Sequence, residues 1–162
     1  MLLQFILIGV CLLGMALMWA KNLRLAQLGF VLWVAAPWIM PFMEQPRFWD
    51  IAIWQMWGAV AIAGGLVLAV WATLQLKKEA SSGKLVMTGP YKHIRHPLYL
   101  GLVFVYVGLC WVMSAIYSFY FGLIVLAIIW LQAYLEEKIY LAPKFGDEFI
   151  NYKKASGMFW FK

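Results

Sequence analysis

The chain has 162 residues, of which 65% are hydrophobic and 12% are charged, and its formal net charge at pH 7 is +6. Soluble domains are roughly 45–50% apolar and about 25% charged, so a soluble fold of this length could not bury so much apolar surface. The composition therefore indicates an all-α polytopic membrane protein, and the lack of a soluble basic segment argues against nucleic acid as a partner.

Two apolar stretches open the chain. Leu2–Ala20 has the length of a membrane span, and its start without a basic region predicts no cleaved signal peptide. Ala26–Phe42 is a shorter candidate, in which we expect Pro37 to kink the helix and Pro41 to end it. Whether this second stretch crosses the membrane completely is left open by the sequence.

Phe48–Leu76 predicts a third helix that is longer than a bilayer needs. At 1.5 Å per residue its apolar part exceeds the core of about 30 Å, so it tilts or projects from the membrane. Gly65 and Ala69 form a small-residue pair within it, of the kind that lets two helices approach closely.

The second half begins with the polar segment Lys77–Tyr91 and continues with two further spans. We expect a fourth span at Pro97–Met113, a turn at Ser114–Ser118 and a fifth span at Phe119–Glu137. These two spans form a hairpin, so the chain returns at its end to the membrane face from which it left. We accordingly divide the chain into two parts. Residues 1–76 contain three N-terminal membrane helices, and residues 77–162 contain the candidate functional residues.

The tail after Pro143 predicts one more helix, with Phe145, Phe149 and Tyr152 on a single face. Its polar residues lie mostly elsewhere, which is typical of an amphipathic helix lying at the membrane interface. Phe159–Phe161 would then anchor among the lipid headgroups.

The positions of the basic residues indicate the sidedness of the spans. With five spans, twelve of the 13 Lys and Arg residues share one side, and Arg47 falls on the other. Such an excess marks the cytosolic side, so we expect the N-terminus outside and the C-terminus in the cytosol, in a prokaryotic plasma membrane. Without the second span, Lys21 and Arg24 would share the outer loop with Arg47.

The stretch from Gly89 to Gly101 contains both histidines of the chain. Gly89-Pro90 predicts a turn, Pro97 suits the first position of a helix, and His96 then falls at its N-cap. The backbone N–H groups at such a helix start bind carboxylates and phosphates. A plainer interpretation is the basic cluster that cytosolic loops carry without any ligand. The side chains expected around this anion site are Tyr91, His93, Arg95, His96 and Tyr99.

Glu136 and Glu137 end the fifth span, where a carboxylate meets the unfavourable end of the helix dipole. Adjacent helix residues point roughly 100° apart, so we expect that the two cannot jointly face one ligand. Taken alone, the pair could be a solvated helix end. Opposite the helix start at His96, it predicts a site for a ligand with both a carboxylate and a cationic centre.

The two cysteines, Cys11 and Cys110, lie inside apolar runs and are expected to act as small hydrophobic residues. No Cys or His spacing typical of a metal site is present, so we predict no metal.

Three ordered blocks resemble the isoprenylcysteine carboxyl methyltransferase and phospholipid methyltransferase superfamily. They are Gly89–Gly101, Glu136-Glu137 and Phe145–Tyr152, and the resemblance extends over about Lys84–Lys154. It implies a membrane methyltransferase that uses S-adenosylmethionine without a Rossmann domain, and a lipophilic substrate that comes from the bilayer. The cofactor-binding positions that it implies are Leu85, Val86, Tyr91, His96, Pro97, Leu98, Tyr99 and Glu137.

Two departures bear on the substrate. Enzymes of the prenylcysteine type resemble one another in an arginine one turn before the glutamates, where this chain has Ala133. Their Arg-Val-Pro after the last Tyr is also missing, and Lys154-Ala155-Ser156-Gly157 stands there. Both departures favour a phospholipid amine or another lipid-like nucleophile over a prenylcysteine carboxylate.

Catalysis by such a site rests mainly on positioning, because a well-held nucleophile and methyl group can lower the barrier by about 7–11 kcal/mol. An amine must first lose a proton, and His93 and Glu136 are the candidate bases, with Arg95 as a supporting catalytic residue. Two other functions stay open: a membrane reductase that uses NADPH, and a non-catalytic membrane subunit or small-molecule carrier.

Overall fold

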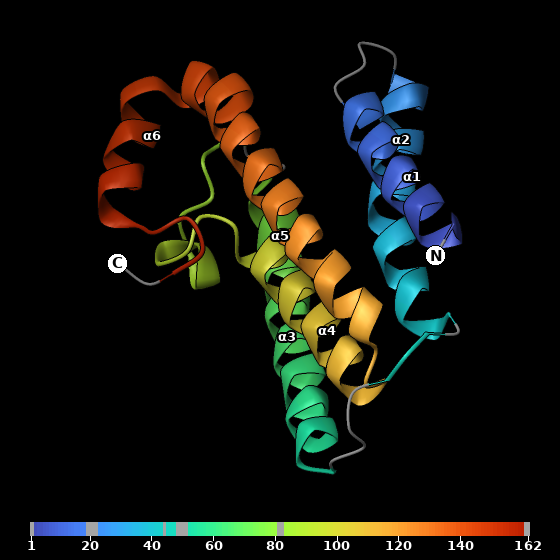
Figure 1. Cartoon of the computed structure of the whole chain (residues 1–162). Helices are drawn as coiled ribbons and strands as arrows, with labels where there is room; N and C mark the ends of the chain where they lie inside the picture. The colour runs from blue at the N-terminus through green and yellow to red at the C-terminus, as the bar shows by residue number, and fades with distance from the viewer. Residues whose placement is uncertain (1, 19–22, 44, 48–51, 81–82, 161–162) are drawn as a thin grey trace. The chain divides into compact units, whose positions relative to one another are not determined.

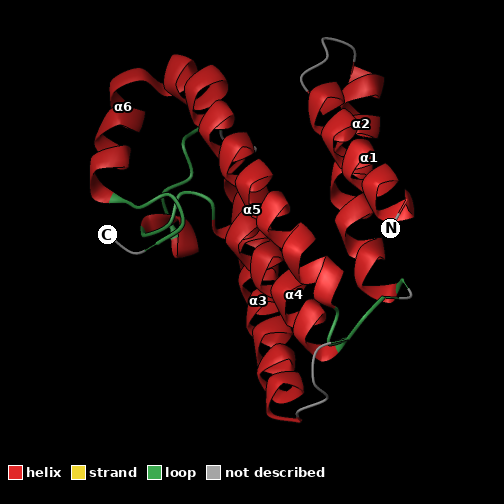
Figure 2. Cartoon of the chain, in the orientation of Figure 1, coloured by secondary structure: helices red, strands yellow, loops and turns green. Residues whose placement is uncertain are grey.

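The structure, a computed structural model, describes residues 2–18, 23–43, 45–47, 52–80 and 83–160. In these ranges the chain is helical and contains no strand, as Figure 2 shows. The predicted all-α class is thus confirmed. The helices are α1 (Leu2–Met18), α2 (Leu23–Ile39), α3 (Ala52–Ala80), α4 (Pro97–Val112), α5 (Ile116–Glu136) and α6 (Ala142–Ala155).

Two segments are long and apolar enough to cross a membrane: Ala52–Glu79, and the continuous helical stretch Ile116–Ala155 that α5 begins. Phe5–Leu17 and Pro97–Val112 are shorter apolar helices. Length and composition therefore support a membrane protein. The count of five spans and the sidedness of the helix ends stay predictions.

The residue contacts divide the chain into two units, and each is described by itself. The first unit contains residues 1–59 and 106–126. In it α1 and α2 lie side by side as a helical pair (Figure 1). The N-terminal end of α3 meets the C-terminal part of α4, where a Cβ added at Gly58 would lie 2.8 Å from the Gly108 oxygen. This contact needs the small residue.

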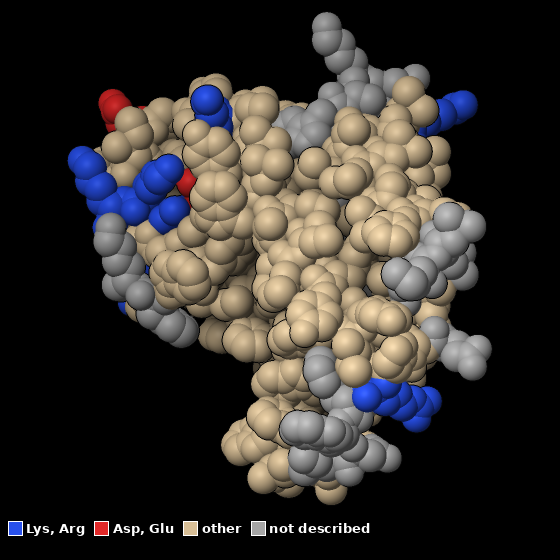
Figure 3. Space-filling view, viewed as in Figure 1, with Lys and Arg blue, Asp and Glu red and all other residues tan. Residues whose placement is uncertain are grey.

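The second unit contains residues 60–105 and 127–162. A Cβ added at Gly65 would lie 2.6 Å from the Gly101 oxygen, and one at Gly101 would lie 2.8 Å from the Ala69 nitrogen. The backbones of α3 and α4 therefore touch, as the Gly65 and Ala69 pair predicted. Helix α6 also belongs to this unit, and Lys and Arg side chains gather over it in Figure 3.

Helix α2 ends close to the predicted position. It continues as helix through Pro37 to Ile39, and a 3₁₀ turn at Met40–Phe42 contains Pro41. At Met43 the backbone is extended, with φ −78° and ψ 151°. Pro41 thus lies in the 3₁₀ turn that ends α2, as expected for a residue without a backbone N–H group.

Helix α5 begins earlier than predicted, at Ile116 rather than Phe119. Ser114 reverses the chain with a positive φ of 50°, so the connection is shorter than the expected turn Ser114–Ser118. Gln45 explains the difference, because its side-chain Oε1 accepts a hydrogen bond from the Ser118 N–H at 2.9 Å. This bond satisfies a free amide of the first helical turn from a distant part of the sequence.

Helix α3 also extends past the predicted end at Leu76 and includes Lys77 and Lys78 in its last turn. Basic side chains there are favourable, because the C-terminal end of a helix carries partial negative charge. Its predicted beginning at Phe48 lies outside the described residues.

The tail is helical as predicted, but α5 runs into it through a wider π-type turn at Glu137–Leu141. Gly146 interrupts α6 with φ 51° and ψ −124°, a conformation that favours glycine. Phe149 and Tyr152 are buried and pack with Leu85, and Phe145 packs against this cluster. The shared apolar face is therefore confirmed, and it covers part of the second unit.

Candidate functional site

The site begins at the turn before α4. Gly89 has a φ of +58° and is the first residue of the 3₁₀ turn Gly89–Lys92. The Ile94 N–H then donates to the Pro90 carbonyl at 3.2 Å. The Leu100 N–H donates to the His96 carbonyl at 3.1 Å, so His96 occupies the N-cap and Pro97 the first helical position, as predicted.

The C-terminal segment pairs with this turn. The Arg95 N–H donates to the Gly157 carbonyl at 2.9 Å, and the His96 N–H donates to the Met158 carbonyl at 3.2 Å. In return, the Gly157 N–H donates to the His93 carbonyl at 3.1 Å. The chain itself therefore occupies the N–H groups of Arg95 and His96, and the anion site at the start of α4 stays a prediction.

Glu137 lies at the centre of a buried charged cluster, with 3% of its side chain exposed. Its Oε1 accepts a hydrogen bond from the Arg95 Nε at 2.7 Å and lies 3.3 Å from the His96 Nε2. Its Oε2 forms an ion pair with the Lys153 Nζ at 3.2 Å and has no further partner among the described residues. Oε2 is therefore a buried acceptor with spare capacity.

Arg95 is almost as buried as its partner. Besides the bond to Glu137, its Nη1 donates to the Ser156 carbonyl and, at 3.4 Å, to the Lys153 carbonyl. An arginine that bridges a carboxylate and the backbone of the tail fixes both in place. Arg95 thus has a positioning role that links α5 to the C-terminal segment.

Glu136 has a different environment from its neighbour. Its side chain is 37% exposed, its Oε2 accepts a hydrogen bond from the Tyr99 hydroxyl at 3.0 Å, and the same oxygen lies 3.9 Å from the His96 Nδ1. The two glutamates therefore contact the two nitrogens of one imidazole ring. Both carboxylates are thus brought together at His96.

Aromatic rings cover this part of the cluster. The rings of His96 and Tyr99 are nearly parallel, 8° apart with centroids at 5.5 Å. Phe159 from the C-terminal segment lies 6.0 Å from His96 at 43°. Stacked and tilted rings restrict the imidazole to one orientation.

The other predicted cofactor positions surround this cluster in the hydrophobic core. Val86 packs with Ala72 and Tyr91, and Leu98 lies against them. The Tyr152 hydroxyl donates to the Tyr91 carbonyl at 2.5 Å. Burial, with a smaller effect from the negative charge of Glu136, raises the pKa of Tyr91 to about 12, so its hydroxyl stays protonated at neutral pH.

The predicted residues thus differ in accessibility. Arg95, His96, Tyr99, Glu136 and Glu137 form one connected cluster. His93 is exposed, and its backbone carbonyl accepts the Gly157 N–H.

Sequence reasoning missed the C-terminal contribution of Lys153, Ser156, Gly157 and Phe159. The structure explains the glycine at 157, since a Cβ added there would lie 1.9 Å from the Trp160 oxygen. Phe159 had been expected to anchor among lipid headgroups, whereas its ring lies against His96.

The sequence model of the phospholipid methyltransferase family matches residues 54–148, more than half of the chain. The match includes the turn before α4, the whole of α4 and α5, and both glutamates. No curated protein and no solved structure matches the chain.

Proposed function

Because the chain belongs to the phospholipid methyltransferase family, we propose that it transfers a methyl group from S-adenosylmethionine to the amine of a lipophilic, membrane-accessible substrate. Methyltransferases of this family generally use that cofactor. When bound, S-adenosylmethionine supplies a methyl group on a positively charged sulfur.

The observation that carries the proposal is the contrast between two adjacent carboxylates. Glu137 is buried and faces the cations of Arg95 and Lys153, whereas Glu136 is partly exposed and is held by the neutral hydroxyl of Tyr99. Glu136 therefore offers negative charge to a ligand from outside the cluster. A substrate ammonium group is the partner that this charge favours.

The residues present also fit the cofactor. S-adenosylmethionine carries both signs of charge, and the cluster supplies both: the spare Oε2 of Glu137 for a cationic group and the half-exposed ammonium of Lys153 for a carboxylate. We therefore propose that the cofactor is held by these residues together with Leu85, Val86, Tyr91, Pro97 and Leu98.

Glu136 is proposed as the acceptor of the substrate proton. A substrate amine is largely protonated at neutral pH and must lose a proton before its lone pair can form a new bond. Glu136 is placed to bind the ammonium, accept that proton and hold the neutral nitrogen in position. The Tyr99 hydroxyl and the His96 ring fix the orientation of this carboxylate.

The surroundings of the glutamates support an amine over a carboxylate substrate. Ala133 is fully buried, and the neighbouring Gln132 is buried as well, so this turn of α5 offers a substrate carboxylate no cation. An unpaired buried charge costs several kcal/mol, and Glu136 would repel it further.

Binding of S-adenosylhomocysteine and of NADPH to the purified full-length protein in detergent tests the proposed cofactor. We expect S-adenosylhomocysteine to bind and Glu137→Gln to weaken it roughly ten- to hundredfold, the effect of about 1.5–3 kcal/mol for one charge-assisted bond. Glu136→Gln should leave this affinity nearly unchanged but lower methyl transfer.

Lys84→Gln is the matched control, because Lys84 is exposed and lies outside the cluster. Binding of NADPH with no affinity for S-adenosylhomocysteine would favour the reductase. Folded wild-type protein that binds neither compound would favour a carrier or subunit.

A further inference from the structure

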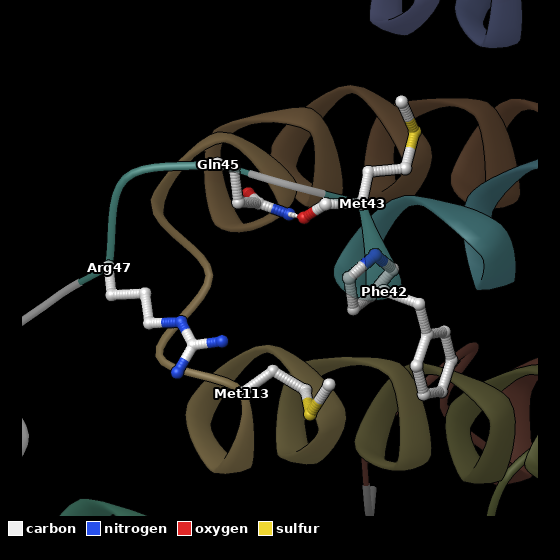
Figure 4. A pocket seen from close by; sticks show the side chains of 6 residues that line it. Phe42, Met43, Gln45, Arg47 and Met113 are labelled. Carbon is white, nitrogen blue, oxygen red and sulfur yellow. Dashed lines mark hydrogen bonds between the residues drawn. The ribbon is translucent and has the colours of Figure 1, made fainter.

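A cavity that the proposed methyl transfer does not use lies in the first unit, beside the C-terminal end of α4. It has a volume of ≈ 450 Å³ and is lined by Pro41, Phe42, Met43, Gln45, Arg47 and Met113. Figure 4 shows the Phe42 and Met113 side chains beside the cavity and the Arg47 side chain extending toward the end of α4. The cavity thus combines apolar walls with one cation.

The segment that carries the cation is held in place. The Ile116 N–H donates to the Pro46 carbonyl at 3.2 Å, and Arg47 and Ala115 form an antiparallel bridge. The Gln45 side chain donates to the Met40 carbonyl at 2.8 Å and to the Ser118 Oγ at 2.9 Å. Arg47 is therefore presented from a backbone anchored to the start of α5.

The two polar side chains of the cavity, Gln45 and Arg47, have different roles. The Gln45 amide uses both its oxygen and its nitrogen on Ser118 and on the 3₁₀ turn, so it serves the fold. Arg47 is exposed, and its guanidinium forms no ion pair with any acidic residue that the structure describes. A guanidinium presents two parallel N–H groups that match a phosphate.

We propose that this cavity binds an anionic phospholipid, with the phosphate on the Arg47 guanidinium and part of an acyl chain against Phe42, Met43 and Met113. One exposed arginine gives little affinity for a free phosphate in water. Burial of an acyl chain against the apolar walls adds favourable binding free energy. Phe42 is 66% exposed, which leaves a large apolar surface for such a chain. The site is separate from the proposed methyl-transfer site, because it uses the other end of α4.

The test is binding of short-chain phosphatidylglycerol, short-chain phosphatidylcholine and inorganic phosphate to the full-length protein in detergent, followed by native mass spectrometry. We expect phosphatidylglycerol to bind more tightly than phosphatidylcholine. An arginine near a lipid surface contributes about 1 kcal/mol, so Arg47→Gln should lower the phosphatidylglycerol affinity about fivefold and abolish the preference. Phe42→Gln should weaken both lipids.

Lys84→Gln removes an exposed basic residue elsewhere and should change nothing. If Arg47→Gln does not fold, Arg47→Lys keeps the charge without the paired N–H groups and should reduce the preference. An undiminished preference for phosphatidylglycerol in a folded Arg47 variant overturns the proposal. Equal competition by inorganic phosphate at the same concentration also overturns it, since the cavity would then bind free anions.

Discussion

The two ends of α4 are stabilised by different chemistry. At His96 the neighbouring contacts are charged and buried, with Arg95, Glu137 and Lys153 in one cluster that contains a spare acceptor. Beyond Met113 the side-chain hydrogen bonds are neutral, because Gln45 bonds to Ser118 and to the Met40 carbonyl, and the one cation of the cavity, Arg47, is exposed. Neutral hydrogen bonds whose donors and acceptors are all paired stabilise a fold, whereas burying charges costs free energy. We therefore expect the buried charges at the His96 end to serve the chemical reaction rather than the stability of the fold.

The largest expected effect comes from breaking the buried ion pair. Arg95→Met leaves Glu137 buried beside a single half-exposed lysine, and the free energy of unfolding should fall by about 3–5 kcal/mol. Denaturant titration in detergent micelles measures this.

The double variant Arg95→Met with Glu137→Leu should recover most of the lost stability without recovering S-adenosylhomocysteine binding. If the double variant is as unstable as Arg95→Met, the buried charge is not the cause of the loss.

A smaller effect is expected at the neutral end. Gln45→Leu leaves the Ser118 N–H without its side-chain partner, and this should cost about 1–3 kcal/mol. The same denaturant titration should report the loss, while the affinity for S-adenosylhomocysteine stays the same. A Gln45 variant of unchanged stability with weakened cofactor binding would show that the neutral end serves the cofactor rather than the fold.

The smallest effect is expected at the exposed member of the charged cluster. Lys153 is 53% exposed, and water and salt screen its attraction to Glu137, so Lys153→Met should cost at most about 1 kcal/mol. Lys154→Met is the control, since that neighbour is also exposed. A loss at Lys153 as large as the loss at Arg95 would mean that the two cations hold Glu137 equally.

Several parts of this structure could be predicted from the sequence because their causes are local. Pro97 fixes where α4 starts, and the spacing of Phe149 and Tyr152 gives the buried face of α6. Gly65 and Ala69 predicted the close contact between α3 and α4. Each of these features depends on residue types within one or two helical turns.

The missed features depend on partners far away in the chain. Gln45 caps α5 at Ser118, 73 positions later, and no pattern near Ser118 indicates it. The pairing of Gly157 with Arg95 uses backbone groups, which every residue other than proline carries. The sequence therefore predicted Arg95, His96 and the two glutamates, but neither Lys153 nor the C-terminal segment that occupies the backbone amide of His96.

The most direct test of amine methylation is transfer of a labelled methyl group from S-adenosylmethionine by the full-length protein in lipid vesicles. The substrates are phosphatidylethanolamine, long-chain amines, hydrophobic thiols and a farnesylcysteine analogue. We predict that an amine reacts fastest to give a base-stable N-methyl product, and that Glu136→Gln lowers its rate about 10²-fold or more. Fastest turnover of the farnesylcysteine analogue to a base-labile methyl ester would contradict the proposed role of Glu136 and the argument from Ala133.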